Sequence, residues 1–299
     1  MRLRASASRD GGGGVEIGIV WPHSATTATA EEIRTFARGV EALGYAHVLV
    51  YDHVLGADPA VHQGWAGPYD IDTPFREPLV LLGFVAGCTA LGVVTGILIL
   101  PQRQTALVAK QAAELDLLTD GRLRLGVGIG WNAVEYEALG ERFSTRARRI
   151  EAQVALLRRL WTERTVSERS EFDLVPGAGL CPAPVQRPIP IWFGARTPPA
   201  YERAGRLGDG WLPLVQPGPR LSEALGHVRA GAERAGRDPG AIGMQGRVDW
   251  RGDVDNVAAQ VERWRDAGAS HLGISTMGPA PASLDAHLER LEVVAKAIL

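Results

Sequence analysis

Cysteine is scarce in this 299-residue sequence, which contains only Cys88 and Cys181. The two lie far apart, so the sequence indicates no disulfide framework, and neither stands at a spacing typical of metal ligands. No cluster of His, Cys and Glu has such a spacing either, so we predict no metal site. We interpret both cysteines as thiols of a cytoplasmic protein, and Cys88, within an apolar run, as a small buried side chain.

The sequence also lacks an excess of charge and a long uninterrupted hydrophobic run. Its 32 Lys and Arg residues nearly balance its 34 Asp and Glu residues, and the net charge of −2 gives no reason to expect binding to nucleic acid. The most apolar stretch, residues 79–94, is interrupted by glycine and threonine, which argues against a membrane span. Residues 1–14 lack the apolar core of a signal peptide, and we predict that they form a disordered extension.

What the sequence does contain is a regular alternation of short apolar runs with amphipathic segments. The runs that predict strands are 15–21, 46–52, 92–100, 122–129, 189–195, 209–215, 241–249 and 269–276. The segments that predict helices are 29–45, 77–90, 105–119, 145–163, 197–208, 220–236, 253–268 and 283–299. Strands that alternate with helices run parallel, and eight such units close most naturally into a (β/α)8 TIM barrel. A doubly wound sheet is the alternative.

No shift in composition divides residues 15–299, so we predict a single domain with an irregular insertion, residues 164–188, between the fourth helix and the fifth strand. The insertion predicts a short hairpin around 166–174. A long segment rich in Gly, Pro and Asp follows the second strand as far as Phe75, and loops of this length usually serve function. Because chemistry in a TIM barrel takes place at the carboxyl ends of the strands, the candidate positions are 22–23, 52–53, 96–97, 128–132, 194–197, 213–215, 247–249 and 275–276.

The stretch LGVGIGWN places glycines at alternate positions, Gly126, Gly128 and Gly130. A dinucleotide-binding loop requires G-x-G-x-x-G followed at once by a helix. Here Trp131 stands where the third glycine belongs, and the periodicity predicts the next helix only near Thr145, so we reject that interpretation. Alternate glycines leave one face of a strand without side chains. That face either admits something flat and bulky or is filled by crowded neighbours, and the pattern alone leaves both explanations open.

The stretch FGARTPPA predicts an anion site. Thr197 is a suitable N-cap for a helix whose first residues are Pro198 and Pro199. The backbone N–H groups of residues 194–197 would then point to the mouth of the barrel, where a helix N-terminus beside Arg196 attracts phosphate. A capped helix without a ligand is the alternative.

Several segments together resemble one known family. The segments YDHVL, EPLVLLGF, TGILILPQR, AKQAAELDLLTDGRLRLGVG, GVGIGWNAVEYEALG, PIWFGA and RLGDGWLP are similar, in this order, to the bacterial luciferase-like monooxygenase family. The similarity is closest to its branch that uses the deazaflavin coenzyme F420. The resemblance implies a (β/α)8 barrel with the cofactor ring across its mouth. It also implies that a hydride passes between the ring and a small organic substrate, such as an alcohol, an imine or an activated C=C bond, and that the protein is a homodimer.

The resemblance implies roles for residues at two strand ends. His53 is implied as a proton donor or substrate contact, because the pKa of histidine generally lies near working pH. Asp52 either orients His53 or binds backbone. Gly96 and Ile97 are implied to form a non-prolyl cis peptide behind the ring.

Further cofactor contacts are implied at the fourth and fifth strands. Gly128, Gly130 and Asn132 are implied to line the pocket beside the ring, with the amide of Asn132 bonded to polar ring edges. F420 and FMN both carry a phosphate, and the residues implied to bind it are Gly194, Ala195, Arg196 and Thr197.

The substrate contacts are implied to be aromatic. Trp131 stands where some relatives that oxidise sugar phosphates carry a glutamate. We predict that it contacts substrate with Trp65 and Tyr69 of the long loop, and packing under that loop is the alternative. We interpret Glu135 and Glu137, which follow, as solvated side chains.

The cofactor and the activity both have alternatives. FMN-dependent relatives share the barrel, so an FMN-dependent luciferase-like monooxygenase is the first alternative to an F420-dependent oxidoreductase. A non-catalytic paralogue that binds a flavin-like ligand is the second, from another functional class.

Overall fold

The computed structural model describes residues 14–23, 28–278 and 283–299. The N-terminal extension predicted for residues 1–14 lies outside the described residues except for Gly14. Whether residues 15–299 constitute a single domain stays a prediction. None of the helices in the described part of the chain combines the length and the apolar character needed to cross a membrane.

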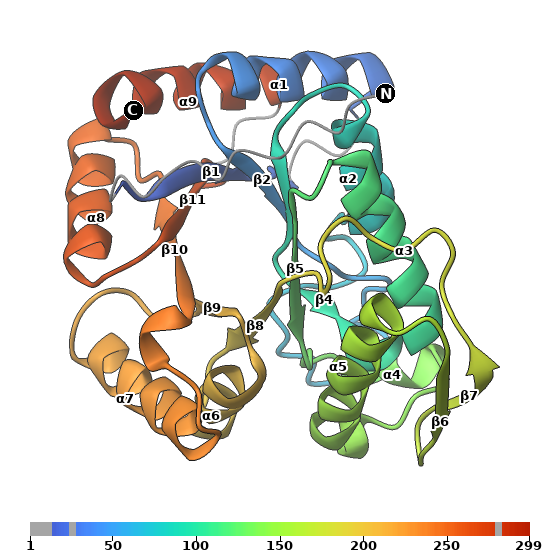
Figure 1. Cartoon of the computed structure of the whole chain (residues 1–299). Coiled ribbons are helices and arrows are strands. Elements are labelled where there is room, and N and C mark those ends of the chain that lie inside the picture. The colour runs from blue at the N-terminus through green and yellow to red at the C-terminus, as the bar shows by residue number, and fades with distance from the viewer. Residues whose placement is uncertain (1–13, 24–27, 279–282) are drawn as a thin grey trace, which may run out of the picture.

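Parallel strands close into an eight-position barrel, which confirms the predicted fold and rejects the doubly wound alternative (Figure 1). The strands are β1 (Glu16–Val20), β2 (His47–Val50), β3 (Gly92–Thr95), β4 (Leu98–Ile99), β5 (Leu123–Gly128), β8 (Ile191–Ala195), β9 (Gly210–Pro213), β10 (Gly243–Asp249) and β11 (His271–Ser275). β1 pairs with both β2 and β11, so the first and last strands of the chain are neighbours. β3 and β4 share the third position, since each of them pairs with β5.

A helix follows each position of the barrel, and these helices form an outer layer (Figure 1). They are α1 (Ala30–Ala42), α2 (Pro78–Ala86), α3 (Thr105–Leu118), α5 (Arg146–Thr162), α6 (Pro198–Leu207), α7 (Pro219–Arg234), α8 (Val254–Asp266) and α9 (Leu284–Ile298), with short 3-10 turns η1 (Leu100–Gln102), η2 (Phe143–Thr145) and η3 (Pro239–Ala241). α1 starts with a capping box, in which the side chains of Thr29 and Glu32 each accept the other's backbone N–H.

The insertion after α5 holds an antiparallel hairpin of β6 (Val166–Arg169) and β7 (Leu174–Ala178), as predicted. Both cysteines are free thiols. Cys88 is half-buried and not fully buried as predicted, because it lies just past the end of α2, where its Sγ donates to the carbonyl oxygen of Phe84 at 3.3 Å.

One helix was not predicted. α4 (Ala133–Ala138) begins directly after the glycine-rich strand, although the periodicity predicted no helix before Thr145. Its N-cap is Asn132, whose Oδ1 accepts from the backbone N–H of Glu135 at 3.2 Å. Six residues form fewer than two turns, which is too short for an amphipathic pattern to be recognised.

The barrel interior and the helix layer have separate hydrophobic cores, because successive side chains of a strand face opposite sides. The outer core, between strands and helices, includes Trp161 and Trp264. The inner core consists of Val20, Leu49, Val94, Trp192 and Leu212, with Tyr51 and Ile97 packed against it. Each such side chain stabilises the fold by about 1.5–3 kcal/mol when buried. The inner core therefore fills the barrel below the carboxyl ends of the strands.

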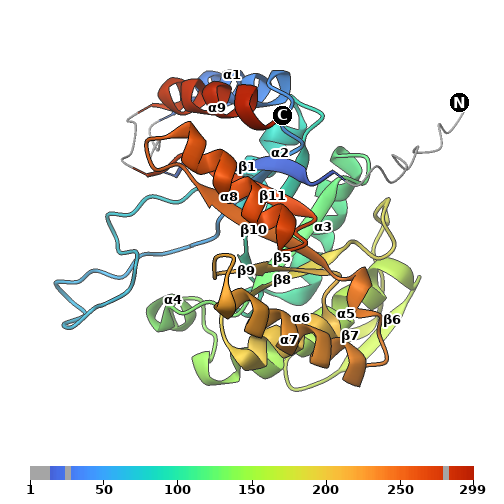
Figure 2. The same ribbon diagram turned by 90° about the vertical axis from the view of Figure 1, so that its left-hand side faces the viewer.

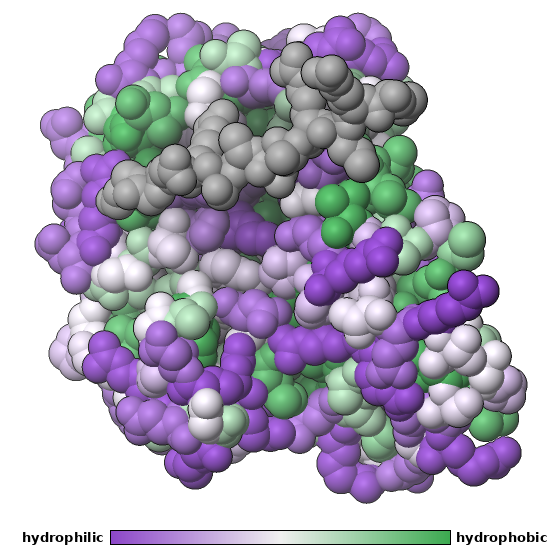
Figure 3. All heavy atoms as spheres, viewed as in Figure 1, coloured by the Kyte–Doolittle hydropathy of each residue, from purple (hydrophilic) through white to green (hydrophobic). Residues whose placement is uncertain are grey.

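The two ends of the barrel differ. The long loop of residues 51–77 and α4 project from the same end (Figure 2), which is the end where the strands finish, since both segments follow strands directly. The part of the opposite end that is coloured in Figure 3 shows hydrophilic and hydrophobic residues side by side. The predicted site residues lie at the end where the strands finish.

Candidate active site

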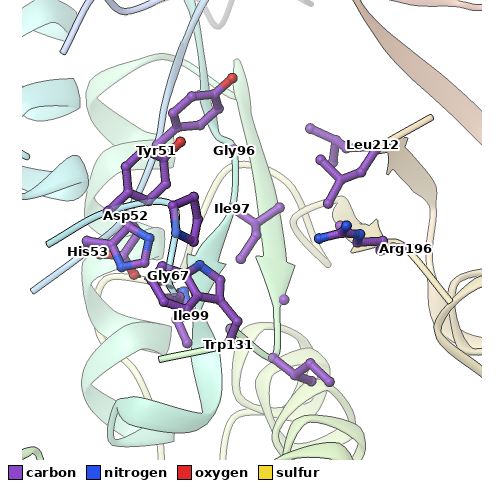
Figure 4. A pocket seen from close by; sticks show the side chains of 18 of the residues that line it. Tyr51, Asp52, His53, Gly67, Gly96, Ile97, Ile99, Trp131, Arg196 and Leu212 are labelled. Carbon is purple, nitrogen blue, oxygen red and sulfur yellow. Dashed lines mark hydrogen bonds between the residues drawn. The ribbon is translucent and has the colours of Figure 1, made fainter. Parts of the chain in front are cut away.

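A cavity of about 880 Å³ opens at the carboxyl end of the strands, a size typical of sites for cofactors and small molecules. Figure 4 shows His53 and Trp131 on one side of it, Arg196 on the other and Ile97 between them. The cavity brings together nearly all the predicted site residues. Those that line it are Asp52, His53, Trp65, Tyr69, Gly96, Ile97, Gly128, Gly130, Trp131, Gly194, Ala195, Arg196 and Thr197.

Asn132 is the exception, because it does not line this cavity as predicted, and its contact with a cofactor stays a prediction. Its side chain lines a smaller adjacent cavity of about 290 Å³. Both ends of the amide are used locally, because Oδ1 caps α4 and Nδ2 donates to the carbonyl oxygen of Leu55 at 3.2 Å. Asn132 therefore ties the long loop to α4.

The glycines of the fourth and fifth barrel positions make room for a neighbouring side chain. The peptide between Gly96 and Ile97 is cis, as the resemblance implied. A Cβ on Gly128 would lie 2.5 Å from Ile97 Cδ1, and one on Gly194 would lie 2.9 Å from Ile97 Cγ2. Of the two explanations left open by the sequence, crowding by neighbours is the one the structure shows at these positions. Ile97 thereby becomes the apolar surface in the middle of the cavity.

His53 stands in a cluster of aromatic rings at the edge of the cavity. Its ring centroid lies 5.3 Å from that of Tyr69, 4.8 Å from Phe75 and 5.5 Å from Trp131. Trp131 in turn packs against Trp65, with 5.6 Å between centroids. These contacts hold the imidazole plane and bring the three predicted aromatic substrate contacts to one wall.

Glu135 is the residue that the sequence interpretation placed wrongly. It was expected to be solvated, but its side chain is fully buried behind His53. Its carboxylate accepts from His53 Nδ1 at 3.3 Å and from Gln102 Nε2 at 3.0 Å, as well as from backbone N–H groups of the long loop. Burial raises the pKa of the Glu135 carboxyl, but the hydrogen bonds from His53, Gln102 and Val54 outweigh it and hold the pKa below its ordinary value.

Asp52 binds backbone, which selects one of the two roles left open for it. Its Oδ2 accepts from the backbone N–H of Ile99 at 2.8 Å, and its Oδ1 receives Arg103 Nη2 at 2.8 Å. Arg103 also binds Glu77 at 3.0 Å. Asp52 therefore fixes the segment after the cis peptide, while the carboxylate bonded to His53 is Glu135.

Arg196 and the start of α6 form the opposite wall. Thr197 is the N-cap as predicted, with Pro198 and Pro199 following, but its side chain makes no capping hydrogen bond. None of the carboxylates in the described residues forms an ion pair with Arg196. The helix N-terminus and the guanidinium therefore both offer N–H donors to an anion in the cavity.

Two further arginines line the cavity that the sequence did not assign to the site. Arg146 belongs to α5, and Arg247 stands at one of the candidate strand ends, but neither was given a role. Arg247 pairs with Asp249 at 3.0 Å and shares a hydrogen bond with Tyr51. Asp52 is the single carboxylate in the lining and is itself paired with Arg103, so the cavity favours an anionic ligand.

Within residues 14–23, 28–278 and 283–299, no three His, Cys, Asp or Glu side chains are grouped in a way that could hold a metal ion.

Two relatives place the chain among known sequences. An uncharacterised protein of Mycobacterium bovis is 31% identical over 287 residues, which cover 88% of this chain and 93% of that protein. A phthiodiolone/phenolphthiodiolone dimycocerosates ketoreductase of the same species is 34% identical over 197 residues, but the match covers only 57% of this chain and 50% of the ketoreductase.

Solved structures share the fold at low identity. The monooxygenase RslO1 from Streptomyces bottropensis has a TM-score of 0.76 at 21% identity, with 95% of this chain and 98% of that one covered. An F420-dependent secondary alcohol dehydrogenase has a TM-score of 0.76 at 18% identity, with 95% and 99% covered. The FMN complex of a 3,6-diketocamphane monooxygenase from Pseudomonas putida has a TM-score of 0.74 at 12% identity, with 95% and 98% covered.

The sequence itself matches a family model over most of its length. The model of the luciferase-like monooxygenase domain matches residues 15–265. Together with the closed barrel and the cavity at its carboxyl end, this match shows that the chain belongs to the luciferase-like monooxygenase family.

Proposed function

We propose that the protein is an F420-dependent oxidoreductase that transfers a hydride between the deazaflavin and a small organic substrate. The coarser conclusion, an oxidoreductase of the luciferase-like family, rests on the family match and on neighbours that use F420 or FMN. The finer one rests on the chemistry of the cavity wall. When bound, F420 would supply the hydride-accepting and hydride-donating carbon.

The cavity suits an anionic cofactor with a flat ring. Ile97, supported by Gly128 and Gly194, offers an apolar surface in the middle of the cavity. Arg196 and the backbone N–H groups at the start of α6 would bind the phosphate, because a helix N-terminus and a guanidinium both stabilise a negative charge. Gly130 and Ala195 would add contacts along the same wall.

The position of His53 in the cavity is the single observation that favours a reaction in which a proton moves together with the hydride. Interconversion of an alcohol and a carbonyl moves a hydride and a proton, so it requires an acid or base beside the carbon that reacts. His53 lines the cavity and is backed by a buried carboxylate. We propose an alcohol or carbonyl compound as the substrate. A solved F420-dependent alcohol dehydrogenase with an F420–acetone adduct and a partly matching ketoreductase are consistent with that class.

The apolar part of the substrate would lie against Trp65, Tyr69 and Trp131. These three rings form a wall next to His53, and aromatic faces bind apolar groups through large contact areas. We also propose a homodimer in the cytoplasm, in line with the family resemblance.

An FMN-dependent monooxygenase is the second candidate. The phosphate site at Arg196 and α6 fits the phosphate of FMN equally well, and the diketocamphane monooxygenase holds FMN in the same fold. The two candidates differ in the need for His53 as a proton partner.

The placement of the phosphate is tested by Arg196→Ala. Loss of a charge-assisted hydrogen bond of about 1.5–3 kcal/mol should weaken F420 binding by about 10- to 150-fold, measured by fluorescence titration. Arg206→Ala is the matched control, because Arg206 lies in the last turn of the same helix and pairs with Glu151 away from the cavity. Unchanged affinity in Arg196→Ala would refute this phosphate site.

A further inference from the structure

We propose that Glu135 is a positioning residue that holds the proton of neutral His53 on Nδ1, so that Nε2 is the atom available to accept a substrate proton. The inference rests on the proposed acid–base role of His53. It concerns a side chain on α4 that has no contact with the main cavity of its own.

The four hydrogen bonds to the carboxylate define the proton position. Oε2 faces His53 Nδ1 at 3.3 Å and Gln102 Nε2 at 3.0 Å. Oε1 faces the backbone N–H groups of Val54 and Leu55, the latter at 3.2 Å. An ionised carboxylate only accepts hydrogen bonds, so Nδ1 must carry a proton to be bonded to it. A neutral imidazole has one N–H, and Nε2 is then left with a lone pair.

Burial makes the hydrogen bonds of Glu135 necessary. Glu135 has no exposed surface, and the side chain of His53 is only 10% exposed. A buried carboxylate is costly unless it is hydrogen-bonded, and here it has four donors that keep it ionised. The aromatic rings of Tyr69, Phe75 and Trp131 fix the plane of the imidazole, while Glu135 fixes its proton.

The chemical step balances with this assignment. In the oxidation of an alcohol, bound F420 would supply the acceptor for the hydride of the carbinol carbon. His53 Nε2 would take the proton that is released when the O–H bond breaks. The product is a carbonyl compound, and the imidazolium is stabilised by the adjacent Glu135 carboxylate. In the reverse direction the Nε2 proton is returned to the carbonyl oxygen.

Glu135→Gln separates positioning from folding. The backbone N–H groups of Val54 and Leu55 cannot turn, so the amide oxygen of Gln would face them. Its NH2 group would then face His53 and Gln102. The side-chain oxygen of Gln102 is buried without a hydrogen bond in the structure, so rotation of that amide provides an acceptor. The NH2 group would donate to His53 Nδ1, which forces the proton onto Nε2 and removes the lone pair from the cavity.

The test is the tautomer of His53, read by two-bond 15N–1H correlation spectra of the protein without cofactor, at a pH where the imidazole is neutral. The His53→Ala variant identifies the signals. We expect the Nδ1–H tautomer in the wild type, the Nε2–H tautomer in Glu135→Gln and the wild-type tautomer in Glu137→Gln. Glu137 is the matched control, because it lies on the same helix and is exposed. A wild-type protein in the Nε2–H form overturns the proposal, even if the variant fails to fold.

Turnover distinguishes this inference from the function on which it rests. With the tautomer inverted, turnover should fall by about 10²-fold or more while the affinity for F420 is retained. If the tautomer inverts and turnover does not change, Glu135 positions His53 as proposed, and the acid–base role of His53 is overturned instead. If Glu135→Gln folds and keeps the Nδ1–H tautomer, the positioning role is contradicted.

Discussion

At the scale of single residues, two buried carboxylates behind the mouth of the barrel have different partners. Asp52 faces the backbone N–H of Ile99 and the guanidinium of Arg103, and so stabilises the segment that carries Ile97. Glu135 faces His53 and the long loop. We expect the first to matter mainly for stability and the second mainly for the proton carried by His53.

Removal of the Asp52 charge should destabilise the fold. Asp52→Asn leaves Arg103, which is only 15% exposed, without its buried partner, and we expect a loss of about 2–3 kcal/mol in the free energy of unfolding. Glu77, the other partner of Arg103, is 39% exposed, so Glu77→Gln should lower the free energy of unfolding by less than about 1 kcal/mol. Urea unfolding of both variants measures the difference. Equal losses would show that burial of the pair does not matter.

The sequence predicted which strand-end residues line the cavity, but it did not predict which residues they bind. His53, Trp131 and Arg196 line the cavity because the carboxyl ends of parallel strands meet there. The sequence placed Glu135 in solvent because carboxylates usually are solvated, and nothing local shows that four donors from distant segments converge on it. A buried partner from another segment is visible only in three dimensions.

At the scale of elements, α4 anchors the long loop. The loop of residues 51–77 has no helix or strand of its own, and its first residues are held by Asn132 and Glu135 of the α4 segment. Gly67 of the loop packs against the ring of Trp131, just before α4. The wall of the proposed substrate site therefore depends on a helix of only six residues.

Asn132→Ala should loosen this loop. Loss of the α4 cap and of the bond to Leu55 should cost about 1 kcal/mol, which makes local opening of the loop about fivefold more frequent. We expect faster limited proteolysis within residues 54–75. Thr29→Ala, which removes the capping box of α1, should cost a similar amount of stability without changing cleavage there. Cleavage that is equal in the two variants would contradict the anchoring role.

Elements with a clear period were predicted, and a short one was not. α5 shows its buried side chains at helical spacing, with Ile150, Val154, Leu157 and Trp161 all buried. α4 is too short for such a pattern, so the capping role of Asn132 was not predicted, and the residue was assigned to the cofactor from the resemblance alone. Capping geometry, which depends on backbone angles, distinguishes the two roles.

At the scale of the whole molecule, the closed barrel buries histidines that must stay neutral. Burial lowers the pKa of His23 to about 4, and neighbouring His53 adds to the effect. Burial likewise lowers the pKa of His287 to about 4, with a contribution from Arg290. His47 is fully buried, and burial holds its pKa well below the ordinary value, with further lowering by Arg124 and His271.

Because these buried histidines are neutral, we expect the protein to lose stability in mild acid. Between pH 6.5 and about 4 the unfolded chain takes up protons that the folded protein does not, so the free energy of unfolding falls as pH falls. Each such histidine contributes about 1.4 kcal/mol per pH unit where the difference is complete. His287→Asn should be less stable at pH 7.5 but show a shallower loss down to pH 4.5 in urea titrations. A slope equal to that of the wild type would contradict a neutral, buried His287.

The barrel itself was predicted because its pattern repeats eight times along the chain, and the pairing of β1 with β11 closes it. The cofactor was not settled in the same way, since F420 and FMN use the same fold and both carry a phosphate. The difference between them lies in chemistry at the ring, which a pattern of strands and helices does not record.

Titration of the purified protein with F420 and, separately, with FMN tests the central claim most directly, with binding followed by fluorescence. We expect micromolar binding of F420 and no comparably tight binding of FMN. Tight binding of FMN together with NADPH-driven oxygen uptake would contradict it and identify a monooxygenase instead.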